Sequence, residues 1–301
     1  MQRLIHEVFC KRIVGAAIAL SCLLASATSI ATPVHIFYPG TASVTDTRAG
    51  YYVKLLDLVL SKTGIQYELQ PNALPMASPR TIQKIANADG LDVTWGPTTQ
   101  ELEQALLPVR IPIDKGVLGL RLLLIKKRDR SLFESIHTLA RLQLLTAGQQ
   151  RDWSDTEILR ANGMKVVGAD IYEQMFQMLA ADRFQYFPRG VAEIWGEEKS
   201  HADLDLAVEQ HLALRYPACS YFFVSKGNTK LAQSIEEGLH IAMRDGSFDK
   251  LFQQYNGEYI KLAHLNTRTV FELNNPLNPN GLECRGINIG GIDKEKKKIS
   301  E

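Results

Sequence analysis

The segment from Tyr216 to Tyr255 constrains the fold more than any other part of this sequence. It contains Tyr221–Val224, an aromatic and β-branched run that favours a strand. A turn follows at residues 226–228, and two apolar stripes with helical spacing come next, separated by Gly246 and Ser247. A strand that leads into two amphipathic helices this late in a chain indicates a return to a lobe begun much earlier.

The first 31 residues have the layout of a secretory signal peptide. Basic residues precede an apolar run over residues 13–25, and small residues follow it. This run is shorter than a typical membrane-spanning helix. We therefore expect cleavage after Ala27 or Ala31 and a periplasmic protein. The less favoured alternatives are lipoprotein anchoring through Cys22 and an uncleaved anchor.

Composition narrows the range of partners. The 301 residues include 34 basic and 33 acidic ones, for a net charge of +1, so no overall field favours nucleic acid or an anionic membrane. Beyond the signal peptide no apolar run is long enough to span a membrane, and we expect a soluble monomer. Cys219 and Cys284 remain after cleavage, and both a disulfide between them and unpaired thiols stay open as alternatives.

Strand-like and helix-like stretches alternate through the first third of the mature chain. Residues 34–38, 65–69 and 91–95 are strand-like, with helix-like stretches between them. This order predicts parallel strands and a three-layer lobe. The long apolar run at residues 117–127 then predicts a strand that leaves this lobe.

The middle of the chain repeats the alternation and predicts a second lobe, which ends where residues 218–225 return to the first. Two such lobes would bind ligands between them, at strand ends and helix starts. The predicted organisation is a signal peptide at residues 1–31, lobe 1 at 33–122, lobe 2 at 123–220, the return part of lobe 1 at 221–278 and a disordered tail at 279–301.

Three stretches resemble one known family, the periplasmic solute-binding proteins of extracellular family 3, which serve polar amino-acid ABC transporters. The stretches are LDVTWGPTT, RLLLIKK and, most specifically, SYFFVSKGNTKLAQSIEEGL with DGSFDKLFQQY. The resemblance covers about Val34 to Asn274. It implies a type II two-lobe α/β fold, each lobe a mixed sheet flanked by helices, joined by two crossing strands. It also implies a small polar ligand, delivered to a membrane permease or read by a membrane sensor.

The sequence departs from this family in the ligand site. Where relatives hold an α-carboxylate with an arginine, this chain has Thr98 followed by Thr99-Gln100-Glu101. Where they hold the ammonium with an aspartate in the second lobe, Arg189 lies at or beside that position. Thr98 and Arg189 are therefore candidate ligand contacts, and an amino acid held in the usual way is not what these residues favour.

Other candidates come from residue chemistry. Tyr38 and Trp95 end two predicted strands, so their rings could sandwich part of a ligand, or could simply be core or rim aromatics. Gln150, Arg151 and Trp153 precede a helix, whose first amides and Arg151 favour an anion; the alternative is an ordinary turn with a surface arginine.

Two further arginines, Arg110 and Arg121, flank the outgoing strand, and either could bind a carboxylate with two hydrogen bonds. The alternative for each is a surface ion pair. We include Arg110 among the predicted ligand contacts.

No enzyme motif of the common classes is present, and we expect no catalytic residues, cofactor or metal. His201, Asp203 and Asp205, with Glu197 and Glu198 nearby, are interpreted as a solvated acidic loop rather than a metal site. We therefore expect an exported solute-binding protein. The alternatives are a sensing or interaction module and, less favoured, an exported dehydratase-like enzyme.

Overall fold

The structure is a computed structural model that describes residues 32–40, 49–75 and 79–279. The predicted signal peptide, Cys22, Cys284 and the predicted tail beyond Pro279 lie outside the described residues. Cys219 is disulfide-bonded, and its partner also lies outside them.

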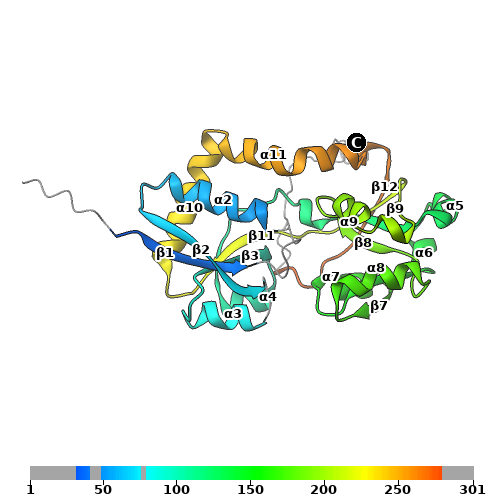
Figure 1. Cartoon of the computed structure of the whole chain (residues 1–301), viewed down its shortest axis with the longest axis horizontal. Helices are drawn as coiled ribbons and strands as arrows, with labels where there is room; N and C mark the ends of the chain where they lie inside the picture. The colour runs from blue at the N-terminus through cyan, green and yellow to red at the C-terminus, as the bar shows by residue number, and fades with distance from the viewer. Residues whose placement is uncertain (1–31, 41–48, 76–78, 280–301) are drawn as a thin grey trace, which may run out of the picture. The chain divides into compact units, whose positions relative to one another are not determined.

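Strands and helices alternate along most of the described chain, as the sequence predicts (Figure 1). In chain order the elements are β1 (Val34–Gly40), α2 (Gly50–Ser61), β2 (Tyr67–Pro75), α3 (Pro79–Ala86), β3 (Val93–Pro97), α4 (Gln100–Ala105), β4 (Leu107–Val109), η1 (Val117–Gly119), β5 (Leu120–Lys126), η2 (Lys127–Asp129), α5 (Arg130–Glu134), α6 (Leu139–Leu142), β6 (Thr146–Gln150), α7 (Ser154–Ala161), β7 (Lys165–Ala169), α8 (Tyr172–Ala180), β8 (Phe187–Gly190), α9 (Ile194–Ser200), η3 (Ala202–Leu204), β9 (Leu206–Val208), β10 (Leu212–Arg215), β11 (Ser220–Val224), α10 (Thr229–Arg244), α11 (Ser247–Leu262), η4 (Leu265–Thr267) and β12 (Thr269–Glu272).

The first lobe is built on the sheet β3-β11-β4, in which the predicted return strand β11 is central and antiparallel to both neighbours. Phe222 and Val224 of β11 pack into one hydrophobic cluster with α2 and α10, whereas Tyr221 and Phe223 pack on the other face with α3 and α4. Burial on both faces explains why this strand is a continuous apolar run rather than an alternating one. The predicted three-layer lobe is confirmed. The predicted parallel pairing of β3 is wrong, because β3 pairs with β11 and the two strands run antiparallel.

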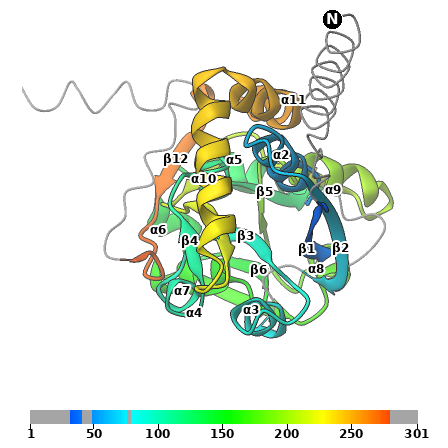
Figure 2. The same ribbon diagram turned by 90° about the vertical axis from the view of Figure 1, so that its left-hand side faces the viewer.

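Helix α10 crosses this sheet, as Figure 2 shows, and also packs closely against α2. Its predicted apolar stripe of Leu231, Ile235, Leu239 and Ala242 is buried. Asn228 caps the helix by accepting a hydrogen bond from the Leu231 amide.

The close packing of α10 on α2 depends on Gly238. A Cβ atom at this position would lie 2.1 Å from the Val59 carbonyl oxygen, which is backbone and has little freedom to move. We expect Gly238→Ala to lower the free energy of unfolding by about 1–3 kcal/mol, because overpacking outweighs the better helix propensity of alanine. Gly257→Ala in α11 is the matched control, since that Cβ would first meet the mobile amide end of Gln253. Denaturant unfolding of both variants tests this, and equal stability would contradict it.

The second lobe is built on the sheet β12-β10-β5-β8, with β9 also paired to β5. Leu122 and Leu124 of β5 face α8 and α9, and Leu123 and Ile125 face α7. The apolar run predicted as a strand is therefore again buried on both faces. Strands β6 and β7 form a parallel pair, and Ala147 of β6 bridges to Tyr186 just before β8.

The chain passes between the two sheets at residues 110–119 and at residues 216–219, directly before β5 and β11, the two strands that the sequence predicts as crossings; both strands themselves lie within a sheet. The crossing segments touch, because the Tyr216 amide donates to the Gly119 carbonyl at 3.0 Å. A Cβ atom on Gly119 would lie 2.0 Å from the Tyr216 carbonyl oxygen, so this contact requires glycine.

After α11 the chain passes to the second sheet once more, where β12 pairs in parallel with β10. The buried side chain of Arg268 holds this passage by donating to the backbone oxygens of Ala263, Glu209 and Leu212. The lobe boundaries expected from the sequence do not include this passage, and they stay a prediction.

Candidate functional site

An aromatic cluster lies where β1 and β3 of the first lobe end. The ring centroids of Tyr38 and Trp95 are 6.1 Å apart, so the structure brings these two predicted contacts together. Tyr52 of α2 also stacks on Trp95, with ring centroids 5.8 Å apart. Trp95 is 2% exposed, and its indole nitrogen has no hydrogen-bond partner in the described part of the chain. Tyr52 was not among the contacts predicted from the sequence.

A second aromatic cluster lies in the second lobe and encloses Arg189. The Arg189 guanidinium carbon is 4.7 Å from the ring centre of Trp153, 4.9 Å from that of Phe187 and 5.5 Å from that of Tyr172. Such contacts are attractive because the ring faces are electron-rich. Trp153 and Arg189 were predicted as separate ligand contacts, and the structure places them against each other.

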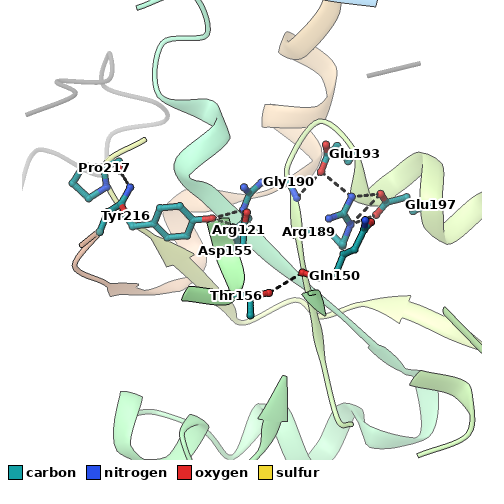
Figure 3. A network of polar contacts seen from close by, with 11 residues as sticks. Arg121, Gln150, Asp155, Thr156, Arg189, Gly190, Glu193, Glu197, Tyr216 and Pro217 are labelled. Carbon is teal, nitrogen blue, oxygen red and sulfur yellow. Dashed lines mark hydrogen bonds and ion pairs between the residues drawn. The ribbon is translucent and has the colours of Figure 1, made fainter. Parts of the chain in front are cut away.

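The charge of Arg189 is neutralised within the protein (Figure 3). Its Nη2 lies 2.6 Å from a carboxylate oxygen of Glu197 and 3.1 Å from one of Glu193, and its side chain is 3% exposed. Burial alone would lower the pKa of Arg189, but these two carboxylates raise it well above its ordinary value. This geometry favours a structural role for Arg189.

Glu197 corrects one interpretation of the sequence. It was placed with a solvated acidic loop, yet it lies on α9 with 8% of its surface exposed. It also accepts a 2.6 Å hydrogen bond from the Tyr172 hydroxyl. No group of three or more His, Cys, Asp or Glu side chains among the described residues is arranged to hold a metal ion.

The remaining predicted contacts also bind neighbouring side chains. Arg110 forms a two-point ion pair with Glu103, and Thr98 donates to the same carboxylate at 2.7 Å. Arg151 pairs with Asp170 at 2.7 Å. The side-chain amide of Gln150 donates a hydrogen bond to the Asp152 carboxylate. Arg110, Arg151 and Arg189 are therefore all occupied by carboxylates of this chain, and their assignment as ligand contacts stays a prediction.

Arg121, at the start of β5, is arranged differently. Its Nε donates to Asp155 and to the Tyr216 hydroxyl, both at 2.7 Å, and Tyr216 donates in turn to Asp155 (Figure 3). Asp155 is the second residue of α7, which begins directly after the predicted helix-start segment. Burial lowers the pKa of Arg121, but Asp155, Tyr216 and Glu193 together more than offset this and raise it above its ordinary value, so the guanidinium is charged.

The outer edge of Arg121 has no such partner. Its Nη1 and Nη2 make no hydrogen bond within the described residues, although only 7% of the side chain is exposed. A Cβ atom built on Gly190 would lie 3.0 Å from Nη1 of Arg121 and 2.8 Å from a carboxylate oxygen of Glu193. Glycine at position 190 therefore lets the guanidinium of Arg121 and the carboxylate of Glu193 both lie close to the backbone there.

A small cavity of about 10 Å³, which is room for about one water molecule, adjoins Arg121. Its walls come from both lobes, from the crossing segments and from the chain after β12. The lining residues are Pro97, Thr98, Thr99, Leu118, Arg121, Ser154, Asp155, Ile158, Tyr216, Ala218, Asn275 and Leu277. Thr98 is the predicted ligand contact that lines this cavity, and the sequence prediction missed Asp155 and Tyr216.

Comparison with solved structures finds two-lobe binding proteins. An ancestral arginine-binding protein bound to arginine matches with a TM-score of 0.53 and 19% identity, covering 73% of this chain and 97% of that one. The fold is periplasmic-binding-protein-like. This agrees with the sequence resemblance at the level of the fold.

Two other structures share this periplasmic-binding-protein-like fold. An arginine-specific periplasmic binding protein of Salmonella typhimurium matches with a TM-score of 0.55 and 17% identity, covering 74% of this chain and 99% of that one. A histidine kinase sensor domain matches with a TM-score of 0.54 and 17% identity, covering 75% of this chain and 97% of that one. No family model matches the sequence, and no curated protein matches it. No helix in the described ranges has the length and apolar character needed to cross a bilayer.

Proposed function

We propose that this chain is an exported, non-enzymatic protein that binds a small carboxylate-bearing ligand in the cavity beside Arg121. The outer guanidinium edge of Arg121 is the observation that carries the proposal. Asp155 and Tyr216 fix the guanidinium from its Nε side, so Nη1 and Nη2 are oriented for a planar two-oxygen acceptor. Charge-assisted pairs of this kind, largely out of water, are the stronger class of hydrogen bond.

Glu193 narrows the ligand class. It lies across Gly190 from Arg121, where it pairs with Arg189 and accepts a hydrogen bond from the Gly190 amide, and its charge would repel a simple anion. A zwitterion such as an amino acid carries its own ammonium group, which would offset the repulsion between its carboxylate and Glu193. The similar proteins named above as binding arginine support this choice.

The cavity as described is too small for an amino acid, so binding requires the lobes to separate and close again. A ligand that binds the closed form better would shift this equilibrium. We propose that a membrane permease reads the closed form. A membrane sensor is the second choice, supported by the similarity to a kinase sensor domain.

Calorimetric titration of the exported chain, unfolded and refolded to remove bound molecules, tests the proposal. L-arginine, L-glutamine, L-glutamate and succinate are the probes. We expect one of the three amino acids to bind with a micromolar or lower dissociation constant, and succinate to bind more weakly because Glu193 repels it. Absence of heat and of thermal stabilisation with every probe would contradict the proposal.

One observation favours a second candidate, an interaction module that binds no small molecule. The aromatic cluster of the second lobe is filled by Arg189, and the cavity holds about one water. In that case small-angle scattering should show the same closed form with and without every probe. A ligand-dependent decrease in the radius of gyration favours the binding protein instead.

A further inference from the structure

The chain after β12 passes over both lobes. We call residues 273–277 the strap. At its start the Leu273 amide donates to the Arg215 carbonyl at 2.8 Å. The next residue, Asn274, makes a reciprocal pair with Asn162 at the end of α7: its amide donates to Oδ1 at 2.9 Å, and its carbonyl accepts from Nδ2 at 2.7 Å. Three hydrogen bonds therefore attach the start of the strap to the second lobe.

The other end of the strap reaches a crossing segment and the first lobe. The Asn275 amide group donates to the Pro217 carbonyl at 2.8 Å. The Leu277 carbonyl accepts a longer hydrogen bond, 3.4 Å, from the Gln100 amide at the first turn of α4. Asn275 also accepts from the Leu277 amide at 3.0 Å, which fixes the turn between them.

The strap also forms part of the cavity wall. Asn275 and Leu277 line the cavity together with Arg121, Thr98 and Tyr216. Leu277 is half-buried, and it packs against the hydrophobic cluster of the second lobe that contains Tyr216. A ligand held by Arg121 would therefore meet the strap on one side.

We propose that the strap is a latch across the two lobes, and that its release from α4 opens the cavity for ligand exchange. Within the described residues, one hydrogen bond attaches the strap to the first lobe, and at 3.4 Å it is longer than usual, whereas three hydrogen bonds attach the strap to the second lobe. Local opening starts where such contacts are fewest. The strap should thus detach from α4 first and stay attached to the second lobe. The ligand-exchange part of this inference rests on the proposed function, because the cavity that it covers is the one assigned to the ligand.

One substitution removes the latch with little other change. Gln100→Pro deletes the amide that donates to Leu277, at the first position of a helix, where proline is well tolerated. Thr99 is already in an extended conformation, as the residue before proline prefers to be. Gln100→Ala is the matched control, because it keeps the amide and loses only an exposed side chain. Leu277→Ala is a second test variant, which removes the side-chain contact without touching α4.

The first measurement needs no ligand. In the full chain, we expect Gln100→Pro and Leu277→Ala to speed hydrogen exchange of the strap amides at least fivefold and to raise the radius of gyration in small-angle scattering. Gln100→Ala should match the wild type in both. Exchange rates and radius equal to those of the control in both test variants would overturn the latch, whatever the ligand proves to be.

The second measurement follows tryptophan fluorescence after rapid mixing with L-arginine or L-glutamine. We expect Gln100→Pro to raise both the association and the dissociation rate constants at least fivefold. If neither probe binds the wild type, the proposed function fails, and the ligand-free measurement still decides the latch. If a probe binds with unchanged rates in a variant whose strap is released, the role in ligand exchange is wrong.

Discussion

Replacing Arg189 by methionine is expected to lower the free energy of unfolding by about 3–5 kcal/mol. The reason is that Glu197 would keep a buried carboxylate without its cation, and breaking a buried pair from one side costs about this much. The contacts with Trp153 and Phe187 would be lost as well. Denaturant unfolding followed by far-ultraviolet circular dichroism measures the change.

Two variants show whether the unpaired carboxylate is the cause. The double variant Arg189→Met with Glu197→Gln should recover more than half of the lost stability, because no net charge is then left buried at that pair. Arg110→Met is the matched surface control. Its partner is also a glutamate, but its side chain is 55% exposed, so a loss of about 1 kcal/mol or less is expected. An Arg189→Met variant as stable as Arg110→Met would show that Arg189 does not stabilise the second lobe in this way.

Arg121→Lys is expected to weaken binding of an amino-acid probe about 10- to 100-fold. Lysine keeps a positive charge near Asp155 but lacks the planar two-point edge, and a hydrogen bond to a charged group contributes about 1.5–3 kcal/mol. Calorimetric titration with the amino acid that binds the wild type measures the loss. The unfolding curve should change much less than the affinity, because the ion pair with Asp155 can re-form.

The same chemical change at Arg110 provides the control. Arg110 does not line the cavity and pairs with Glu103, so Arg110→Lys should leave the dissociation constant within about twofold. A probe whose carboxylate is converted to an amide should bind the wild type weakly. Its affinity for the Arg121→Lys variant should be only slightly lower than its affinity for the wild type. An equal loss for acid and amide would show that Arg121 does not bind the carboxylate.

Local patterns predicted much of the fold. The runs at β5 and β11 were recognised as strands because they are continuously apolar, and burial on both faces explains that composition. The stripe of α10 follows from its helical spacing in the same way. The pairing of β3 with β11 was not predicted, since partners so far apart in sequence leave no local pattern.

The contacts that each candidate site residue makes could not be predicted from the sequence. Tyr38 of β1 and Trp95 of β3 do lie together in one lobe. The arginines were chosen by position in the chain, and position does not reveal which carboxylate each one meets. Three of these arginines pair with Glu103, Asp170 and Glu197, and no local sequence motif predicts any of these pairs.

The sequence by itself determined the order of strands and helices, the late return of the chain to its first lobe, and the resemblance to a two-lobe fold. These depend on the period of apolar residues and on turn residues, which act over a few positions. Only the tertiary structure decided that Arg121 lines a cavity and that the strap forms part of the same cavity wall. The reason is that ion pairs and cavity walls depend on distances between residues that are far apart in the chain. The return segment 216–255 brings such residues together, but its local sequence does not show which of them will be in contact.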